Sequence, residues 1–154
     1  MQSHIPPPLV MLLAAALMWA LHHWLPLGYL IAAPWNYFAL VPVAIGRAIT
    51  VAAGARFRQA KTTFDPSKPS EASSLVTNGV FRISRNPMYL GLVLLLVGWA
   101  LWLGTVSPWL VLPLFVIVIS VAHIVPEEQA LEERFGETYL AYRHNVRRWI
   151  GRRW

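Results

Sequence analysis

The chain of 154 residues has no cysteine, and charged side chains make up only 13% of it. An ordinary soluble protein carries about 25% charged residues. The lack of cysteine excludes a disulfide framework and a thiolate metal site. The sequence also lacks a Gly-Lys-Ser/Thr phosphate loop, a Gly-x-Gly-x-x-Gly motif and histidines spaced with acids as metal ligands are. These absences exclude the common nucleotide-phosphate sites and give no reason to expect a metal centre.

Two long stretches, 1–46 and 86–126, contain no Lys, Arg, Asp or Glu. Hydrophobic residues make up 56% of the chain. A soluble domain of this length cannot bury such runs, whereas a helix that crosses a bilayer needs about 20 mostly apolar residues. We therefore predict an integral, multi-pass membrane protein. The first stretch has no Lys or Arg ahead of Leu9 and stays apolar beyond any cleavage site, so we interpret it as a span rather than a signal peptide.

Proline and glycine divide the apolar sequence into about four predicted spans. We expect a single all-α domain over residues 1–154, an integral membrane helical bundle with spans at about 9–24, 35–53, 87–103 and 109–125. Only five residues separate the last two spans, so these must form an antiparallel hairpin. Residues 56–77 form the one long polar connection, which we interpret as a surface loop. Pro126 either ends the fourth span or opens a new helix.

The segment after the fourth span is predicted to be an amphipathic cytoplasmic helix. Large apolar side chains recur there every three or four residues, interrupted at Gly136: Leu131, Phe135, Tyr139 and Tyr142. Arginine and tryptophan interleave in the tail beyond it: Arg143, Arg147, Arg148, Trp149, Arg152, Arg153 and Trp154. This composition suits anionic lipid head groups. We therefore expect membrane lipids as partners and no nucleic acid.

The distribution of positive charge predicts the orientation in the membrane. All 13 Lys and Arg lie late in the second span, in the connection up to Arg85, or after Glu133. The positive-inside rule then places both termini and the long connection in the cytoplasm. Four tryptophans gather at the opposite end, as in an aromatic belt: Trp24, Trp35, Trp102 and Trp109. Arg47, in the second span, either snorkels to the surface or faces the bundle interior and meets a ligand.

A first polar cluster precedes the third span, in Arg85-Asn86-Pro87-Met88-Tyr89-Leu90-Gly91. Asn86 is a preferred N-cap residue and Pro87 suits the first helical position, so a helix start explains part of the motif. It explains Arg85 and Tyr89 less well. Arg85 can bind a carboxylate through a bidentate fork, beside helix N–H groups that favour an anion. We predict a carboxylate-binding site at the cytoplasmic membrane face.

A second polar cluster, Glu127 and Glu128, follows directly on the fourth span. Acids in a first turn stabilise a helix, and a solvated face accounts for the later acids, which are Glu132, Glu133 and Glu137. At the depth of Glu127 and Glu128, however, charge is costly unless it is paired. The hairpin brings both clusters to one membrane face, where a ligand with a carboxylate and an ammonium finds a partner for each. His123 and Glu127, an i, i+4 pair, suit a metal or a hydrogen bond, and we predict the hydrogen bond.

These residues resemble two motifs of the isoprenylcysteine carboxyl methyltransferases and the related phospholipid methyltransferases, including their small bacterial members. The first is Thr77-Asn78-Gly79-Val80-Phe81-Arg82 leading into the Arg85 to Gly91 stretch. The second is Glu127-Glu128-x-x-Leu131 followed by Phe135-Gly136-x-x-Tyr139-x-x-Tyr142. The resemblance covers about residues 75–149. The two motifs, in order and separated by one hydrophobic hairpin, are more specific than either is alone.

The resemblance implies an all-helical membrane methyltransferase that uses S-adenosylmethionine, held at the cytoplasmic side by the last two spans and the C-terminal segment. It implies Arg85 and Glu128 as catalytic residues. It also implies a cofactor site formed by Arg85, Asn86, Pro87, Tyr89, Gly91, Glu127, Glu128 and Leu131. Asn86 stands where the eukaryotic relatives usually have His. An amide does not titrate near neutral pH, which argues against an acid–base role for this position here.

The expected reaction is a direct methyl transfer to a lipophilic acceptor: a lipid, an isoprenoid-linked carboxylate or another small hydrophobic molecule. The protein would supply alignment and desolvation. A carboxylate acceptor needs no general base, whereas an amine must lose a proton, for which Glu127, Glu128 and His123 are the nearby candidates. The alternative function is a non-catalytic membrane scaffold or lipid-binding subunit with the same fold. A transporter would need polar residues near mid-membrane in several spans, which the third and fourth spans do not offer.

Overall fold

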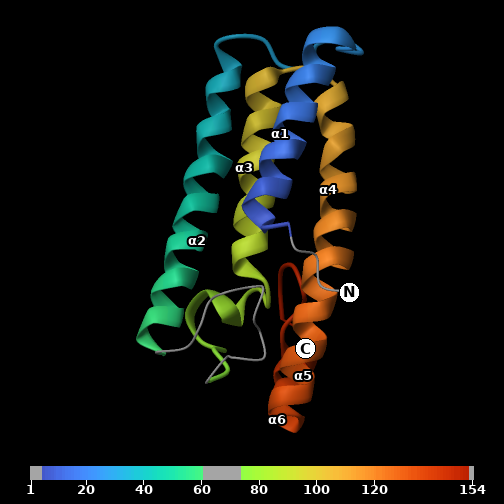
Figure 1. Ribbon diagram of the computed structural model, residues 1–154. Coiled ribbons are helices and arrows are strands. Elements are labelled where there is room, and N and C mark those ends of the chain that lie inside the picture. Colours follow the sequence, from blue (N-terminus) through green and yellow to red (C-terminus); the bar gives the residue numbers. More distant parts are fainter. Residues whose placement is uncertain (1–4, 61–73, 153–154) are drawn as a thin grey trace.

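The computed structural model describes residues 5–60 and 74–152 (Figure 1). Within these residues, six α-helices form the bundle: α1 (Pro7–Trp24), α2 (Leu40–Gln59), α3 (Pro87–Leu103), α4 (Val111–Ile119), α5 (Val125–Phe135) and α6 (Glu137–Asn145). Short 3₁₀-helices, η1 (Trp35–Ala39), η3 (Gly79–Arg82) and η4 (Ser107–Leu110), lie between them, and η5 (Ser120–Ile124) is a π-helical turn. The described residues contain no strand. The predicted all-α membrane bundle is confirmed.

Three helical stretches, 7–24, 35–59 and 107–135, are long and apolar enough to cross a membrane. The 17-residue α3 is equally apolar but shorter, and it has the predicted bounds. The second span was expected to end near residue 53 but continues to Gln59, so Arg56 and Arg58 lie in its last turn. Basic side chains are favourable at that end of the helix dipole, which explains why the helix runs on into charged sequence.

The fourth span also continues further than expected, through Pro126 to Phe135. Proline lacks the N–H that an uninterrupted helix would use. The π-helical turn η5 directly precedes it and shifts the hydrogen-bond register of the helix. Pro126 then falls in the first turn of α5, where a missing N–H costs little. As a result, Glu127 and Glu128 of the second polar cluster lie in the same helical stretch, 107–135, as α4.

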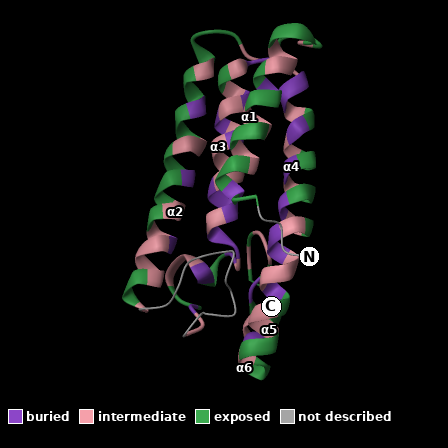
Figure 2. Ribbon diagram, viewed as in Figure 1, coloured by how far each residue is buried: buried purple, intermediate pink, exposed green. Residues whose placement is uncertain are grey.

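Helix α3 is the centre of the bundle, with α2 on one side and α1 and α4 on the other (Figure 1). Seven residues of α3 are buried, whereas α1 and α2 each bury two. The outward sides of α1, α2 and α4 are exposed, as expected of surfaces that face lipid (Figure 2). Small residues allow α2 and α3 to approach closely: a Cβ on Gly91 would lie 2.1 Å from Thr50 Oγ1, and one on Gly98 2.4 Å from Val43 Cγ2.

At the end of the bundle that carries the tryptophans, the connection between α1 and α2 packs against the turn after α3. Gly104 has a positive φ of 73°, and a Cβ there would lie 2.3 Å from the carbonyl oxygen of Ile31. His22 Nδ1 and Thr105 Oγ1 are 2.9 Å apart. These contacts hold the helix ends together far from the polar clusters (Figure 1). Arg47 is exposed on α2, so the interpretation that it faces the bundle interior is wrong.

Most of the predicted polar connection, 61–73, lies outside the described residues, as do Arg153 and Trp154 of the tail. The described flanks of the connection end at Ala60 and resume at Ser74. From there the chain passes through η3, whose Phe81 packs on the end of α2 beside Ala53 and Phe57. This packing delivers the first polar cluster to the start of α3.

Candidate active site

Asn86 begins α3, but its side chain does not cap the helix. Asn86 Nδ2 instead donates to Glu128 Oε1 at 3.4 Å and to the Arg148 carbonyl oxygen at 3.3 Å. Its backbone N–H donates to Ser84 Oγ at 3.0 Å. Asn86 occupies the N-cap position and Pro87 the first helical position, as predicted, but the asparagine side chain makes no capping hydrogen bond. The amide instead links the two polar clusters and the C-terminal segment.

Glu128 is the centre of the cluster and only 6% exposed. Arg148 contacts it with two hydrogen bonds, Nη2 to Oε2 at 2.7 Å and Nε to Oε1 at 3.1 Å. Arg85 Nη2 lies 3.2 Å from Oε1. The side chains of Arg85 and Glu128 are each 8% exposed, and that of Arg148 is 36% exposed. Two guanidinium groups thus face one carboxylate, which leaves the cluster with a net positive charge.

Glu127 is paired separately, because Tyr89 OH donates to Glu127 Oε1 at 2.5 Å. The predicted hydrogen bond between His123 and Glu127 is absent within the described part of the chain, where His123 Nε2 has no partner. The His123 ring lies instead beside Tyr89, with 6.3 Å between the ring centroids. The hairpin therefore brings together the first turn of α3 and the end of the fourth span, as predicted, but with different pairs.

Helix α6 contributes Tyr139, which the sequence indicated only as part of an apolar stripe. Its side chain is 1% exposed, and its hydroxyl oxygen accepts a hydrogen bond from Arg85 Nη1 at 3.3 Å. Burial, together with the nearby Glu128 carboxylate, raises the pKa of Tyr139 to about 12. Tyr142 OH donates to the Phe81 carbonyl oxygen at 2.7 Å, and burial raises the pKa of this phenol too. Both tyrosines therefore tie α6 to the segment ahead of α3.

The C-terminal segment after α6 folds back on the start of α3 rather than extending toward lipid. Arg85 N–H donates to the Arg147 carbonyl oxygen at 3.1 Å, and Gly151 N–H donates to that of Ile83 at 2.8 Å. This backbone pairing carries Arg148 onto Glu128, whose hydrogen bond raises the pKa of the guanidinium. Arg148, which was expected to contact lipid head groups, is thus engaged by Glu128, and lipid contact by the tail stays a prediction. Arg143 is also paired, to Glu132 at 2.7 Å, on the exposed surface.

Besides Pro87, which opens α3, two further residues of the predicted cofactor set lie outside this hydrogen-bonded cluster. Gly91 is buried against α2, so the structure gives it a packing role, and Leu131 is half-buried one turn after Glu127. The cofactor role of both stays a prediction. Sequence reasoning missed Arg148 and Ser84 as members of the cluster. No local pattern marks either one, because the chain brings Arg148 to Glu128 across 20 residues by the fold alone.

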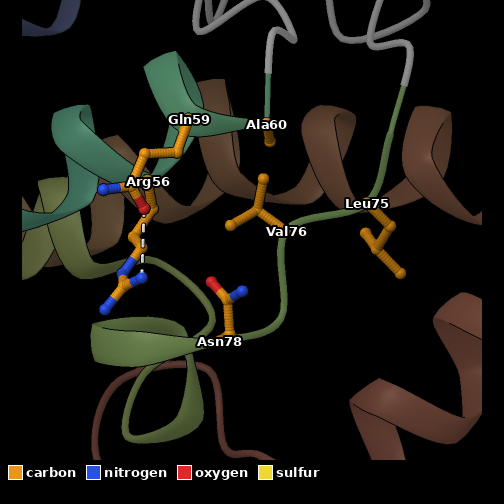
Figure 3. A pocket seen from close by; sticks show the side chains of 6 residues that line it. All are labelled: Arg56, Gln59, Ala60, Leu75, Val76 and Asn78. Carbon is orange, nitrogen blue, oxygen red and sulfur yellow. Dashed lines mark hydrogen bonds between the residues drawn. The ribbon is translucent and has the colours of Figure 1, made fainter.

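An open pocket of about 180 Å³ lies elsewhere at this end of the bundle, between the end of α2 and the segment before η3 (Figure 3). It is lined by Arg56, Gln59, Ala60, Leu75, Val76 and Asn78. Arg56 Nη1 donates to Gln59 Oε1 at 3.1 Å within it. None of the lining residues belongs to the Glu128 cluster, so the pocket does not mark the polar site.

The family described as phospholipid methyltransferase matches residues 35–138 of the chain. The chain belongs to this family. The match runs from η1 to the start of α6 and includes the Arg85 and Glu128 motifs, but it stops before Tyr139 and Arg148. A protein of Haemophilus influenzae described only as uncharacterized is 46% identical over 63 residues, which are 41% of this chain and 100% of that relative. No solved structure matches the chain significantly.

Membership of the phospholipid methyltransferase family supports methyltransferase activity on a lipid-like substrate. The fold agrees with such an activity, because the Glu128 cluster lies at the end of spans that face lipid on their outer sides.

Proposed function

We propose that the protein transfers the methyl group of S-adenosylmethionine to a lipophilic acceptor at the cytoplasmic face of the membrane. In this orientation both termini and the 56–77 connection are cytoplasmic, as the arginines at that end of the bundle favour. The family supports the methyltransferase class. The residues around Glu128 support the cofactor and the place where it binds.

The observation that carries the proposal is the unpaired nitrogen of Arg85. Arg85 Nε is buried and has no hydrogen-bond partner among residues 5–60 and 74–152, although Nη1 and Nη2 are both engaged. A buried donor left unsatisfied costs about 1–3 kcal/mol, which a bound acceptor removes. The excess positive charge of the cluster also favours an anion. The carboxylate of S-adenosylmethionine matches both features, so the residues present fit this end of the cofactor.

Glu127 fits the ammonium end better than Glu128 does. Glu128 is engaged by Arg85, Arg148 and Asn86, whereas Glu127 is contacted by the neutral hydroxyl of Tyr89. The ring of Tyr89 also offers an aromatic face to a sulfonium cation. In this proposal Arg85 binds the cofactor, and Glu128 is a positioning residue that holds Arg85. Asn86, Pro87, Gly91 and Leu131 complete the shape of the site.

Bound S-adenosylmethionine supplies an electrophilic methyl group on a positively charged sulfur. The chain itself supplies orientation and the exclusion of water, since the charged side chains are held by several hydrogen bonds each in a largely buried site. A lipophilic acceptor reaches the site laterally from the bilayer.

Titration calorimetry with S-adenosylmethionine on detergent-purified protein tests this proposal. We expect binding by the wild type and a loss of about 10-fold to 100-fold in affinity for Arg85→Gln, because a hydrogen bond to a charged group contributes about 1.5–3 kcal/mol. Arg143→Gln is the matched control, since it removes an arginine from an exposed ion pair at the same end of the protein. A folded wild type that binds no S-adenosylmethionine would overturn the proposal and favour the non-catalytic scaffold.

A further inference from the structure

Two buried nitrogen atoms at this site have no hydrogen-bond partner among the described residues: Arg85 Nε, which the proposed function assigns to the cofactor carboxylate, and His123 Nε2. His123 is 6% exposed, and its Nε2 is buried without a hydrogen-bond partner in the described part of the chain. The other buried polar groups at this end, Ser84, Asn86 and Glu128, are all hydrogen-bonded. Buried polar atoms are nearly always satisfied in folded proteins. Arg85 Nε already has a proposed partner, so the unsatisfied His123 Nε2 indicates a second partner that is not part of the protein.

The backbone around His123 is also unusual, because His123 lies in the π-helical turn η5. Such turns are rare and frequently occur at functional sites. Here the turn sets His123 beside the ring of Tyr89, at an interplanar angle of 36°. Ile119 and Ile124 next to it belong to the buried apolar core. His123 thus lies where the apolar interior meets the Tyr89–Glu127 pair.

The structure also separates the three side chains able to take a proton from an acceptor. Both carboxylate oxygens of Glu128 are already engaged, by Arg85, Arg148 and Asn86. Glu127 Oε1 accepts a hydrogen bond from the Tyr89 hydroxyl, with 2.5 Å between the oxygen atoms, and Glu127 is assigned to the cofactor in the proposed function. Of these three side chains, His123 is the one that has a buried atom, Nε2, without a hydrogen-bond partner among residues 5–60 and 74–152.

We propose that His123 Nε2 binds the methyl-accepting group and takes the proton that this group loses, so that the acceptor carries an N–H or O–H and is not a carboxylate. This inference rests on the proposed function. The acceptor atom uses a lone pair to bond to the methyl carbon, and the carbon–sulfur bond breaks with its electron pair left on sulfur. The electrons of the N–H or O–H bond stay on the acceptor atom, and the proton moves to the imidazole nitrogen.

The first test needs neither cofactor nor turnover. Protein labelled with ¹⁵N-histidine is studied by NMR in detergent micelles, and the His123 signal is assigned by its absence in His123→Gln. Dodecylamine is then added, with dodecyltrimethylammonium as a control of equal chain length and charge that has no N–H. We expect the Nε2 resonance of His123 to shift with the amine alone. No shift with the amine, an equal shift with the trimethylated control, or a shift with dodecanoate instead would each overturn the inference.

A second test measures transfer of labelled methyl groups from S-adenosylmethionine to vesicles of a total membrane-lipid extract. His123→Gln keeps an amide that can hydrogen-bond but cannot take up a proton. We expect its transfer rate to fall about 100-fold or more, as for loss of a general base, while cofactor binding by calorimetry remains. Transfer at the wild-type rate by this variant contradicts the inference. Failure of the wild type to bind the cofactor would instead contradict the proposed function. The NMR test does not depend on that outcome, because it uses no cofactor.

Discussion

Removal of the Glu128 carboxylate tests whether the cluster is a paired unit in a buried environment. Glu128→Ala leaves Arg85 with a side chain only 8% exposed and no carboxylate beside it. Breaking one partner out of a buried ion pair costs about 3–5 kcal/mol, because the remaining charge is uncompensated. Arg148 adds little to this cost, since its side chain is 36% exposed and can turn to solvent. We expect a loss of about 3–5 kcal/mol in the free energy of unfolding.

The assay is reversible unfolding of the purified protein in mixed micelles, with increasing mole fraction of dodecyl sulfate and tryptophan fluorescence as the signal. Glu132→Ala is the control, because it removes the exposed ion pair with Arg143 and should cost about 0–1 kcal/mol. The double variant Glu128→Leu/Arg85→Leu removes both buried charges. Because buried pairs are often replaced by apolar residues with little loss, it should be more stable than Glu128→Ala. A double variant that is less stable than either single variant, with additive losses, would refute the reasoning.

Two further substitutions test the close packing of α2 against α3 and the burial of Tyr139. Gly91→Ala should lower the free energy of unfolding by about 1–3 kcal/mol, because its Cβ would overlap Thr50 Oγ1. In the same unfolding assay the control Gly54→Ala should be neutral or stabilising, because a Cβ there would have no atom within 4 Å. Equal effects of the two substitutions on the free energy of unfolding would contradict the close packing of α2 and α3. Tyr139 favours its neutral form in the fold, so its contribution to stability is complete below its unfolded pKa of about 10 and is lost as pH rises from there through about 12. Phenolate absorbance near pH 11 should therefore be the same in folded wild type and in folded Tyr139→Phe. After unfolding, the variant should show the signal of one tyrosine fewer than the five of the wild type. A folded variant whose absorbance near pH 11 is lower than that of the folded wild type by one tyrosine would disprove the burial effect.

The sequence was sufficient to predict a membrane protein and most of its helix positions. The reason is that each helix that crosses a bilayer must by itself be long enough and apolar enough to span it. The third span was predicted with its observed bounds, since Pro87 and Gly104 mark its ends. Predictions failed where the sequence changed polarity without the helix ending. The second helix runs on to Gln59, because a helix can leave the apolar layer and continue beyond it. Pro126 lies in the first turn of a new helix, α5, which was one of its two predicted outcomes.

The sequence by itself determined that two polar clusters meet at one membrane face, since a five-residue turn forces the third and fourth spans into a hairpin. Only the tertiary structure decided which groups pair. Arg148 and Tyr139 reach the cluster because the chain after α6 folds back on Arg85 through backbone hydrogen bonds. Such pairing depends on distances between residues far apart in the chain. No local periodicity encodes those distances, and for this reason the sequence did not show that two arginines of the chain itself pair with Glu128.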